Sequence, residues 1–196
     1  MIRSLLALLA FAPLAYSAPL PKFREAPLYF PIQVGAKRVL ELSSGAVGTA
    51  NRETIETVTK VEQKEGKYLV TFSLERPGLN AAASLTSTFA VSEKGISRVR
   101  TQDRELAQPV IVLQLPGKEG NTWELNGMTY KVGKEEEIEV PAGKFKAVSV
   151  TMEQERGAVK QKTTSWYAPK VGLIKTVMIL NGTERITVLK SFTPGK

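Results

Sequence analysis

The chain has 196 residues and a formal net charge of +8, with 27 Lys and Arg, 19 Asp and Glu, no Cys and no His. The absence of His and Cys excludes Ser-His-Asp and Cys-His nucleophile systems, disulfides, thiolate-ligated clusters and His-bearing zinc sites. All of the acidic residues are Glu except Asp103, so Asp-rich calcium loops are excluded as well.

The first residues have the pattern of a secretory signal peptide. Arg3 is the only charge before Lys22, residues 5–14 are apolar, and Ala15 and Ser17 supply small side chains at the minus-three and minus-one positions. We therefore expect residues 1–17 to be removed after Ser17 and the mature chain to be exported, either periplasmic or extracellular. The alternative is an N-terminal membrane anchor, but an apolar run of about 10 residues is too short to span a bilayer. No later apolar run reaches that length, so no transmembrane segment is expected in the mature chain.

Residues 18–28 contain Pro19, Pro21 and Pro27, and we expect a Pro-rich N-terminal arm there. From Tyr29 onward the pattern has period two. The clearest segment alternates between apolar and other side chains, which predicts one buried strand face made of Tyr68, Val70, Phe72 and Leu74.

Two further segments need interpretation. Residues 52–64 carry charges that would suit an exposed helix, but every second residue from Ile55 to Val61 is β-branched, which favours a strand. The apolar run over residues 110–115 predicts a strand that is covered on both faces.

Two turns are strongly specified by Asn-Gly pairs. Asn126-Gly127 and Asn181-Gly182 each lie between strand-like runs. A type I′ turn needs positive φ at both central residues, which Asn and Gly tolerate, so both pairs predict tight β-hairpins. We therefore expect one mostly β domain over residues 29–192, with at least eight antiparallel strands and little helix after the signal peptide.

Two motifs in the C-terminal half resemble a signature of exported bacterial proteins in domain-of-unknown-function families. The first is Val140-Pro141-Ala142-Gly143 followed by Phe145, and the second is Trp-Tyr-Ala-Pro-Lys-Val-Gly-Leu-Ile-Lys at residues 166–175. Residues 29–35 also look like the beginning of the first strand in these families. One departure is that Arg38 and Leu40 stand where aromatic residues are usual.

The resemblance implies a curved antiparallel sheet, a half-barrel or open barrel similar in shape to the half-barrels of bacterial lipoprotein carriers. It implies no catalytic residue. Folding alone also explains the motifs, because Pro141 ends ladder pairing and Gly143 permits a strained turn. Trp166 and Tyr167 are expected to bring apolar area to opposite faces of one strand.

The row Glu135, Glu137 and Glu139 is a candidate for a hard cation or an acid/base pair, since alternate residues share one face of a strand. A solvated sheet face that discourages edge-to-edge aggregation is the simpler interpretation. We therefore expect no metal and no cofactor.

Basic residues gather near the C-terminus. Residues 153–196 hold eight basic and three acidic residues, and Lys160 and Lys162 share a strand face with Trp166. Basic residues interleaved with aromatics suit a polyanion. The export signal argues against nucleic acid, and solubility with weak attraction to an anionic envelope explains the charge more simply.

The leading hypothesis is a non-enzymatic exported β domain whose concave sheet face binds an apolar ligand or an envelope component. The aromatics expected near such a groove are Tyr68, Phe72, Phe89, Phe145, Trp166 and Tyr167. The alternative for all six residues is that they only fill the core.

Two other hypotheses remain. A structural or assembly module would pair with an envelope partner through the N-terminal arm or through a C-terminal edge strand ending at Phe192. A hydrolase that uses only carboxylates would need two Glu side chains facing each other across a cleft. The oligomeric state does not follow from the sequence.

Overall fold

The computed structural model describes residues 27–44, 52–78, 85–102, 104–115 and 118–196. These residues form twelve strands and no helix. The expected signal peptide and most of the Pro-rich arm lie outside the described residues.

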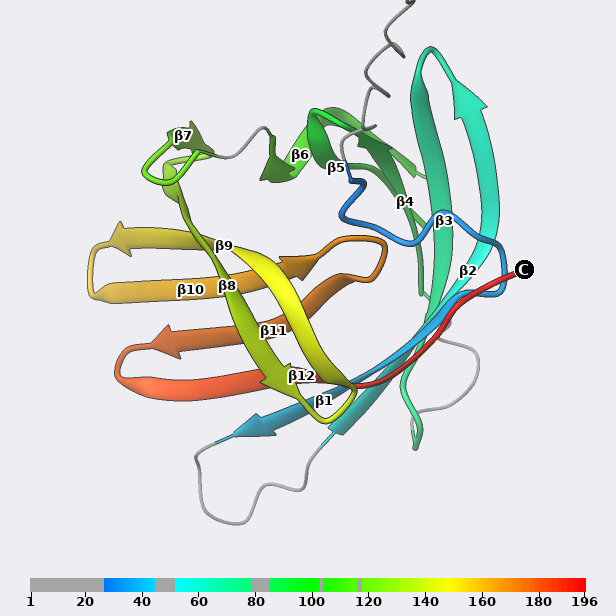
Figure 1. Ribbon diagram of the computed structural model, residues 1–196. Coiled ribbons are helices and arrows are strands. Elements are labelled where there is room, and N and C mark those ends of the chain that lie inside the picture. The colour runs from blue at the N-terminus through cyan, green and yellow to red at the C-terminus, as the bar shows by residue number, and fades with distance from the viewer. Residues whose placement is uncertain (1–26, 45–51, 79–84, 103, 116–117) are drawn as a thin grey trace, which may run out of the picture.

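All twelve strands belong to one antiparallel sheet (Figure 1). The strands are β1 (Lys37–Ser44), β2 (Arg52–Lys64), β3 (Lys67–Glu75), β4 (Leu85–Ser92), β5 (Gly95–Thr101), β6 (Arg104–Gln114), β7 (Thr122–Leu125), β8 (Met128–Val140), β9 (Gly143–Arg156), β10 (Val159–Ala168), β11 (Gly172–Leu180) and β12 (Thr183–Thr193). Their order in the sheet is β6-β5-β4-β3-β2-β1-β12-β11-β10-β9-β8-β7.

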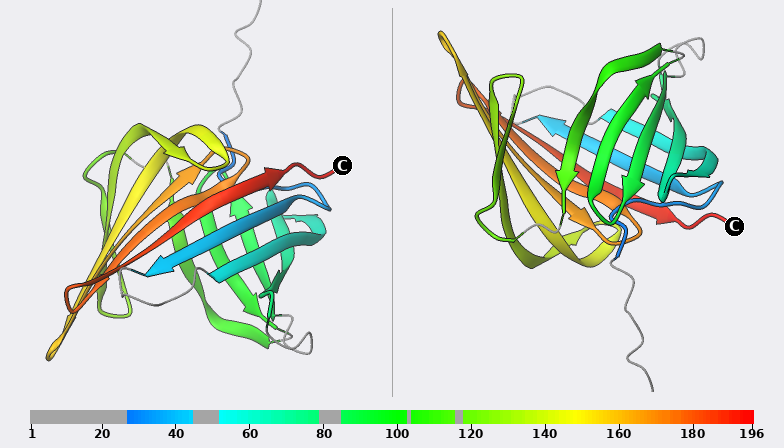
Figure 2. Two further views of the ribbon diagram at one scale, coloured as in Figure 1. Left: turned by 90° about the horizontal axis from the view of Figure 1, so that it is seen from below. Right: turned by 90° about the horizontal axis from the view of Figure 1, so that it is seen from above.

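This order makes the sheet a ring with one break. Strands adjacent in the chain are adjacent in the sheet, and the pairing of β1 with β12 joins the two halves. The pairing fails only between β6 and β7, and the sheet curls into a nearly closed barrel (Figure 2). The predicted curved antiparallel sheet of at least eight strands is therefore confirmed.

The two predicted Asn-Gly hairpins are confirmed. Asn126 and Gly127 have φ angles of 54° and 72°, and Asn181 and Gly182 have φ angles of 48° and 83°. The flanking residues pair directly, Leu125 with Met128 and Leu180 with Thr183, so each loop has two residues. Residues 52–64 form strand β2, as the β-branched alternation predicted.

The larger of two apolar clusters fills the barrel, and we call it the barrel core. Its buried members are Phe30, Ala36, Val58, Val70, Phe72, Val91, Ile96, Leu113, Val132, Val148, Val150 and Tyr167. The predicted face of β3 contributes to it, because Val70 and Phe72 are buried and Tyr68 and Leu74 pack against them. Burial of each large apolar side chain contributes about 1.5–3 kcal/mol, so this cluster is the main source of stability.

A second cluster, which we call the hairpin cluster, lies where the β8–β9 hairpin curls back towards β12. Its buried members are Leu40, Val140, Ala147, Ala168, Val171, Ile174 and Leu189. The turn of this hairpin is fixed by a hydrogen bond from the Ala142 N–H to the Leu189 carbonyl, 3.2 Å long. Trp166 packs against this cluster whereas Tyr167 belongs to the barrel core, so the two rings occupy opposite faces of β10 as predicted.

Arg38 is buried where the two halves of the chain meet. Only 5% of its surface is exposed, its Nη2 lies 2.5 Å from Glu56 Oε2, and its Nη1 donates to the Val171 carbonyl at 3.1 Å. Its guanidinium carbon lies 4.9 Å from the Phe30 ring centroid. At Gly172, a Cβ atom would come within 2.3 Å of Arg38 Nη1, so a side chain there would collide with the guanidinium. The Arg38 guanidinium thus ties together β1, β2 and the turn before β11.

Two expectations about strand positions were wrong. β12, which carries Phe192, lies between β1 and β11 and is not an edge strand. β6, which carries the apolar run of residues 110–115, is an edge strand, and Leu113 is its only buried residue. Sequence patterns report local alternation, whereas the position of a strand in the sheet depends on pairing between distant segments.

Replacing Arg38 with Met should lower the free energy of unfolding by about 3–5 kcal/mol, because it leaves the Glu56 carboxylate buried without its partner. Urea denaturation at neutral pH measures the loss. The control is Arg100→Met, which removes an exposed ion pair with Glu105 and should cost less than about 1 kcal/mol. Adding Glu56→Leu to Arg38→Met should recover part of the lost stability. If Arg38→Met and Arg100→Met lowered the free energy of unfolding equally, this account would be contradicted.

Candidate functional site

The break between β6 and β7, which we call the seam, contains a cavity of about 510 Å³. Its lining comes from the end of β6, from the segment before β7, and from β7 and β8. The lining residues are Gln114, Leu115, Lys118, Asn121, Thr122, Trp123 and Val132. We call this space the seam cavity.

Trp123 enters this cavity because of the hairpin that follows it. The two-residue turn at Asn126-Gly127 places Trp123 directly opposite Tyr130, and their rings stack with centroids 5.1 Å apart and an interplanar angle of 7°. The indole Nε1 of Trp123 is buried and has no hydrogen-bond partner among the described residues. A buried donor without an acceptor costs about 1–3 kcal/mol, so this site is destabilised in the free protein.

The segment before β7 is held rigidly against β8. The Gly120 N–H donates to the Val132 carbonyl, and the Val132 N–H donates to the Asn121 carbonyl, both at 2.8 Å. These bonds extend the β7–β8 ladder to the residues that precede β7. One wall of the seam cavity is therefore fixed.

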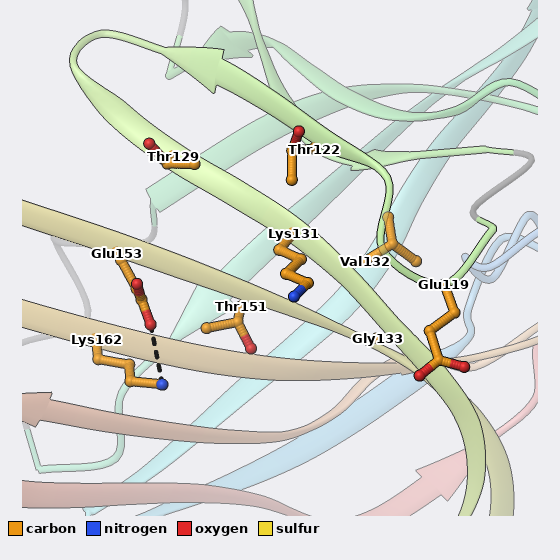
Figure 3. Close-up of a pocket in the computed structure, with 9 residues that line it drawn as sticks. All are labelled: Glu119, Thr122, Thr129, Lys131, Val132, Gly133, Thr151, Glu153 and Lys162. Atoms are coloured by element: carbon orange, nitrogen blue, oxygen red, sulfur yellow. Dashed lines mark ion pairs between the residues drawn. The ribbon is translucent and has the colours of Figure 1, made fainter.

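A second hollow of about 420 Å³, which we call the outer groove, adjoins the seam cavity at Thr122 and Val132 (Figure 3). Its other lining residues are Glu119, Thr129, Lys131, Gly133, Thr151, Glu153 and Lys162. Glu153 and Lys162 form an ion pair at 2.9 Å across β9 and β10, while Lys131 and Glu119 have no ion-pair partner in the described part of the chain. The charged residues of the groove are balanced, two acidic and two basic.

The row of Glu residues lies on the surface of β8. Glu135, Glu137 and Glu139 are all exposed, and Glu139 lies 3.7 Å from Lys144. Within the described residues, no group of three or more carboxylates is placed to hold a metal ion. Glu136, on the other face of β8, accepts a hydrogen bond of 2.8 Å from Trp166 Nε1.

Several of the C-terminal basic residues already have partners. Lys160 pairs with Glu155, Lys162 with Glu153, and Lys190 with both Glu41 and Glu53. The Lys175 ammonium lies 5.4 Å from the Trp166 ring centroid. At least three of the eight basic residues of this region therefore have a carboxylate partner.

The six aromatics named from the sequence are divided between the two clusters. Phe72 and Tyr167 belong to the barrel core and Tyr68 and Phe89 pack against it, whereas Phe145 and Trp166 pack against the hairpin cluster. Phe72 and Phe89 stack with centroids 5.2 Å apart. None of the six lines the seam cavity or the outer groove, so a ligand site on them stays a prediction.

Trp123 and Tyr130 are the aromatic pair beside the seam, and neither was singled out from the sequence. A signal was nevertheless present. A two-residue Asn-Gly turn fixes the register of its hairpin, and counting back from Asn126-Gly127 places Trp123 opposite Tyr130.

Comparison with known proteins agrees with the fold. Residues 96–178, which include both C-terminal motifs, match the family model described as DUF3108-like. The chain resembles the exported families that its motifs indicated. No curated protein matches it.

Two solved structures share the architecture. One is a candidate exported protein with a YmcC-like fold from Bacteroides fragilis, with a TM-score of 0.60 and 16% identity over 85% of this chain and 99% of that one. The other is a candidate lipoprotein from Parabacteroides distasonis, with a TM-score of 0.56 and 14% identity over 87% of this chain and 100% of that one. At these identities the likeness concerns the fold alone. Among the described residues, no helix is long and apolar enough to cross a membrane.

The two tryptophans should respond differently to substitution by Phe. Trp166→Phe should cost about 1–3 kcal/mol, because it leaves the half-buried Glu136 carboxylate without its donor. Trp123→Phe removes an unpartnered N–H and keeps a ring on Tyr130, so stability should change by less than about 1 kcal/mol. Urea denaturation followed by far-UV circular dichroism compares them, and similar losses would show that the Trp123 N–H has an acceptor.

Tyr167 should make stability depend on alkaline pH. Burial raises the pKa of Tyr167 to about 12, and the smaller opposing effects of a hydrogen bond with Ser165 and of the Arg38 charge do not cancel it. Because the unfolded chain ionises this phenol near 10, the contribution of the raised pKa is fully present below pH 10 and is lost as pH rises through 12. Relative to Tyr167→Phe, the natural protein should therefore lose roughly 3 kcal/mol across this range. Urea denaturation of both proteins at each pH is the measurement, and a difference that does not change with pH would contradict the assignment.

Proposed function

We propose that this protein is an exported, non-enzymatic binding module that takes an apolar or amphiphilic ligand into the seam cavity. The observation that carries the proposal is the Trp123 indole, which is buried beside this cavity with no acceptor for its N–H. A ligand oxygen that reached it would remove a cost which the free protein bears.

The walls of the seam cavity suit such a ligand. Leu115, Trp123 and Val132 line it and are also part of, or packed against, the barrel core, so apolar surface runs from the seam inwards. Its volume of about 510 Å³ lies within the range of about 300–1,000 Å³ that is usual for small-molecule sites. Side chains on the remaining wall, such as Lys118 and Asn121, leave a polar rim.

The seam also offers a route of entry. β6 and β7 are the two ends of the sheet order, so no ladder of backbone hydrogen bonds joins them. Widening the barrel between any other two neighbouring strands would break such a ladder. Separation of β6 from β7 is therefore the least costly way to admit a ligand.

Export of this chain is supported by the signal-like residues 1–17 and by the fold it shares with a candidate exported protein and a candidate lipoprotein. The mature protein should therefore be collected from the periplasm or medium of a bacterial host. Its native mass spectrum should show extra mass that organic extraction removes. Bare protein in that spectrum, together with no uptake of added amphiphile, would overturn the proposal.

Polar substitution in the seam should weaken ligand binding. The chain has two tryptophans, so in a Trp166→Phe background the emission of Trp123 reports on the seam alone. Leu115→Gln in this background should weaken binding of an amphiphile by about tenfold or more, since it places an amide on an apolar wall. Ile179→Gln, which changes an exposed apolar residue on β11, is the matched control and should leave the affinity unchanged. Equal affinity for the two variants would place the ligand elsewhere.

A second candidate is an assembly module that pairs through an edge strand. Its support is β6, where Val110 and Val112 are only half-buried at an unpaired sheet edge, and exposed apolar edges favour addition of another strand. Concentration-dependent association of the mature protein in sedimentation experiments would favour this role. A monomer that binds amphiphile would favour the first.

A further inference from the structure

Two buried donor atoms lack a partner in the described part of the chain, and they lie on strands on the two sides of the seam. Among buried side-chain nitrogen and oxygen atoms of these residues, only Arg98 Nε and Trp123 Nε1 make no hydrogen bond. Arg98 is on β5, the strand that pairs with edge strand β6, and Trp123 is on edge strand β7. The two unsatisfied groups therefore lie on opposite sides of the break, and both are donors. Trp123 lines the seam cavity, whereas Arg98 is one strand further in than β6 and lies outside that lining.

Arg98 faces the barrel interior. It pairs directly with Phe89 on β4 and with Val110 on β6, and residues that lie opposite each other on neighbouring strands share a face. Phe89 packs against the barrel core, and Ile96, two residues before Arg98 on the same strand, is a buried member of that core. The guanidinium thus lies beside apolar side chains.

The other described arginines show how unusual this position is. Arg38 is buried but paired with Glu56, and Arg100 is paired with Glu105. Arg52, Arg76, Arg104 and Arg185 are exposed to solvent. Among arginines whose side chains the structure describes, Arg98 alone is half-buried with no carboxylate partner.

A half-buried cation beside apolar side chains carries a desolvation cost when no counter-charge is present, and an anion beside it offsets part of that cost. The guanidinium presents planar, paired N–H donors that match the two oxygens of a carboxylate or the oxygens of a phosphate. The indole N–H on the other side of the seam is a further donor with no acceptor of its own. Both unpaired groups are hydrogen-bond donors and one of them carries a positive charge. A ligand that is negatively charged and has oxygen acceptors would complement them.

We infer that the seam ligand is an anionic amphiphile whose carboxylate or phosphate binds Arg98, while its hydrocarbon tail lies against the apolar lining of the seam and barrel core. This inference rests on the proposed function, which places an apolar or amphiphilic ligand in the seam cavity, and adds the charge and polar chemistry of that ligand.

Three ligands with the same hydrocarbon chain test the charge: palmitate, hexadecyl phosphate and the neutral hexadecanol. Their affinities are measured below their aggregation concentrations from Trp123 emission in the Trp166→Phe background. Palmitate or hexadecyl phosphate should bind about tenfold or more tightly than hexadecanol. The preference between the two anions distinguishes a carboxylate source from a phosphate source.

Variants of Arg98 separate charge from packing. Arg98→Met should abolish the preference for the anions and leave hexadecanol binding unchanged, while Arg98→Lys should keep part of the preference because the charge remains. Arg100→Met is the matched control, since it removes an exposed arginine from the same strand, and it should keep the full preference. Without ligand, Arg98→Met should be as stable as the natural protein or more stable, because it removes an unpaired buried donor.

The outcomes distinguish this inference from the function on which it rests. Equal affinity of the natural protein for hexadecanol and for the anions would overturn the inference and leave the seam as an apolar site. If Arg98→Met and Arg98→Lys both fold and Arg98→Met keeps the full preference for the anions, the inference is also overturned. Binding of none of the three ligands would overturn the proposed function together with the inference.

Discussion

The architecture depends on the pairing of β1 with β12, which is the only strand pairing in the described part of the chain that joins the first six strands to the last six. Arg38 lies at this joint, opposite Phe192 on β12 and Glu56 on β2, and reaches the Val171 carbonyl before β11. Its charge is tolerated in the interior because Glu56, the carbonyl and the Phe30 ring surround it. A buried ion pair of this kind fixes geometry more than it adds stability, and here it fixes how the two halves of the barrel meet.

The seam is the consequence on the opposite side of the ring. A meander that wraps around from the β1–β12 joint brings its two ends, β6 and β7, towards each other without pairing them. β7 has four residues whereas β6 has eleven, so a short edge faces a long one and the lining of the cavity comes partly from the segment before β7. Beside this break, Trp123 on β7 has no acceptor for its indole N–H among the described residues. The continuous β1–β12 pairing on one side of the barrel and the unpaired β6–β7 break on the other thus both follow from the same strand order.

The motifs that suggested the family mainly serve the hairpin cluster. The turn at Pro141-Ala142 reaches Leu189 on β12, and Gly172 leaves the space that the Arg38 guanidinium occupies. Trp166 is held by Glu136 and Lys175 on the face away from the barrel core. These residues therefore specify the curl of the sheet, while the candidate ligand site is formed by residues outside both motifs.

Local chemistry in the sequence determined the strands and turns of this protein. The β-branched alternation of residues 52–64 and the positive φ angles of the Asn-Gly pairs depend on neighbouring residues, so these features could be predicted. Only the tertiary structure decided which strands became edges, why Arg38 is buried, and how the six aromatics divide between two clusters. These features depend on the β1–β12 pairing and on the curvature of the whole sheet, which join residues far apart in the chain. The seam cavity belongs to this second group, except that the Asn126-Gly127 turn already placed Trp123 opposite Tyr130.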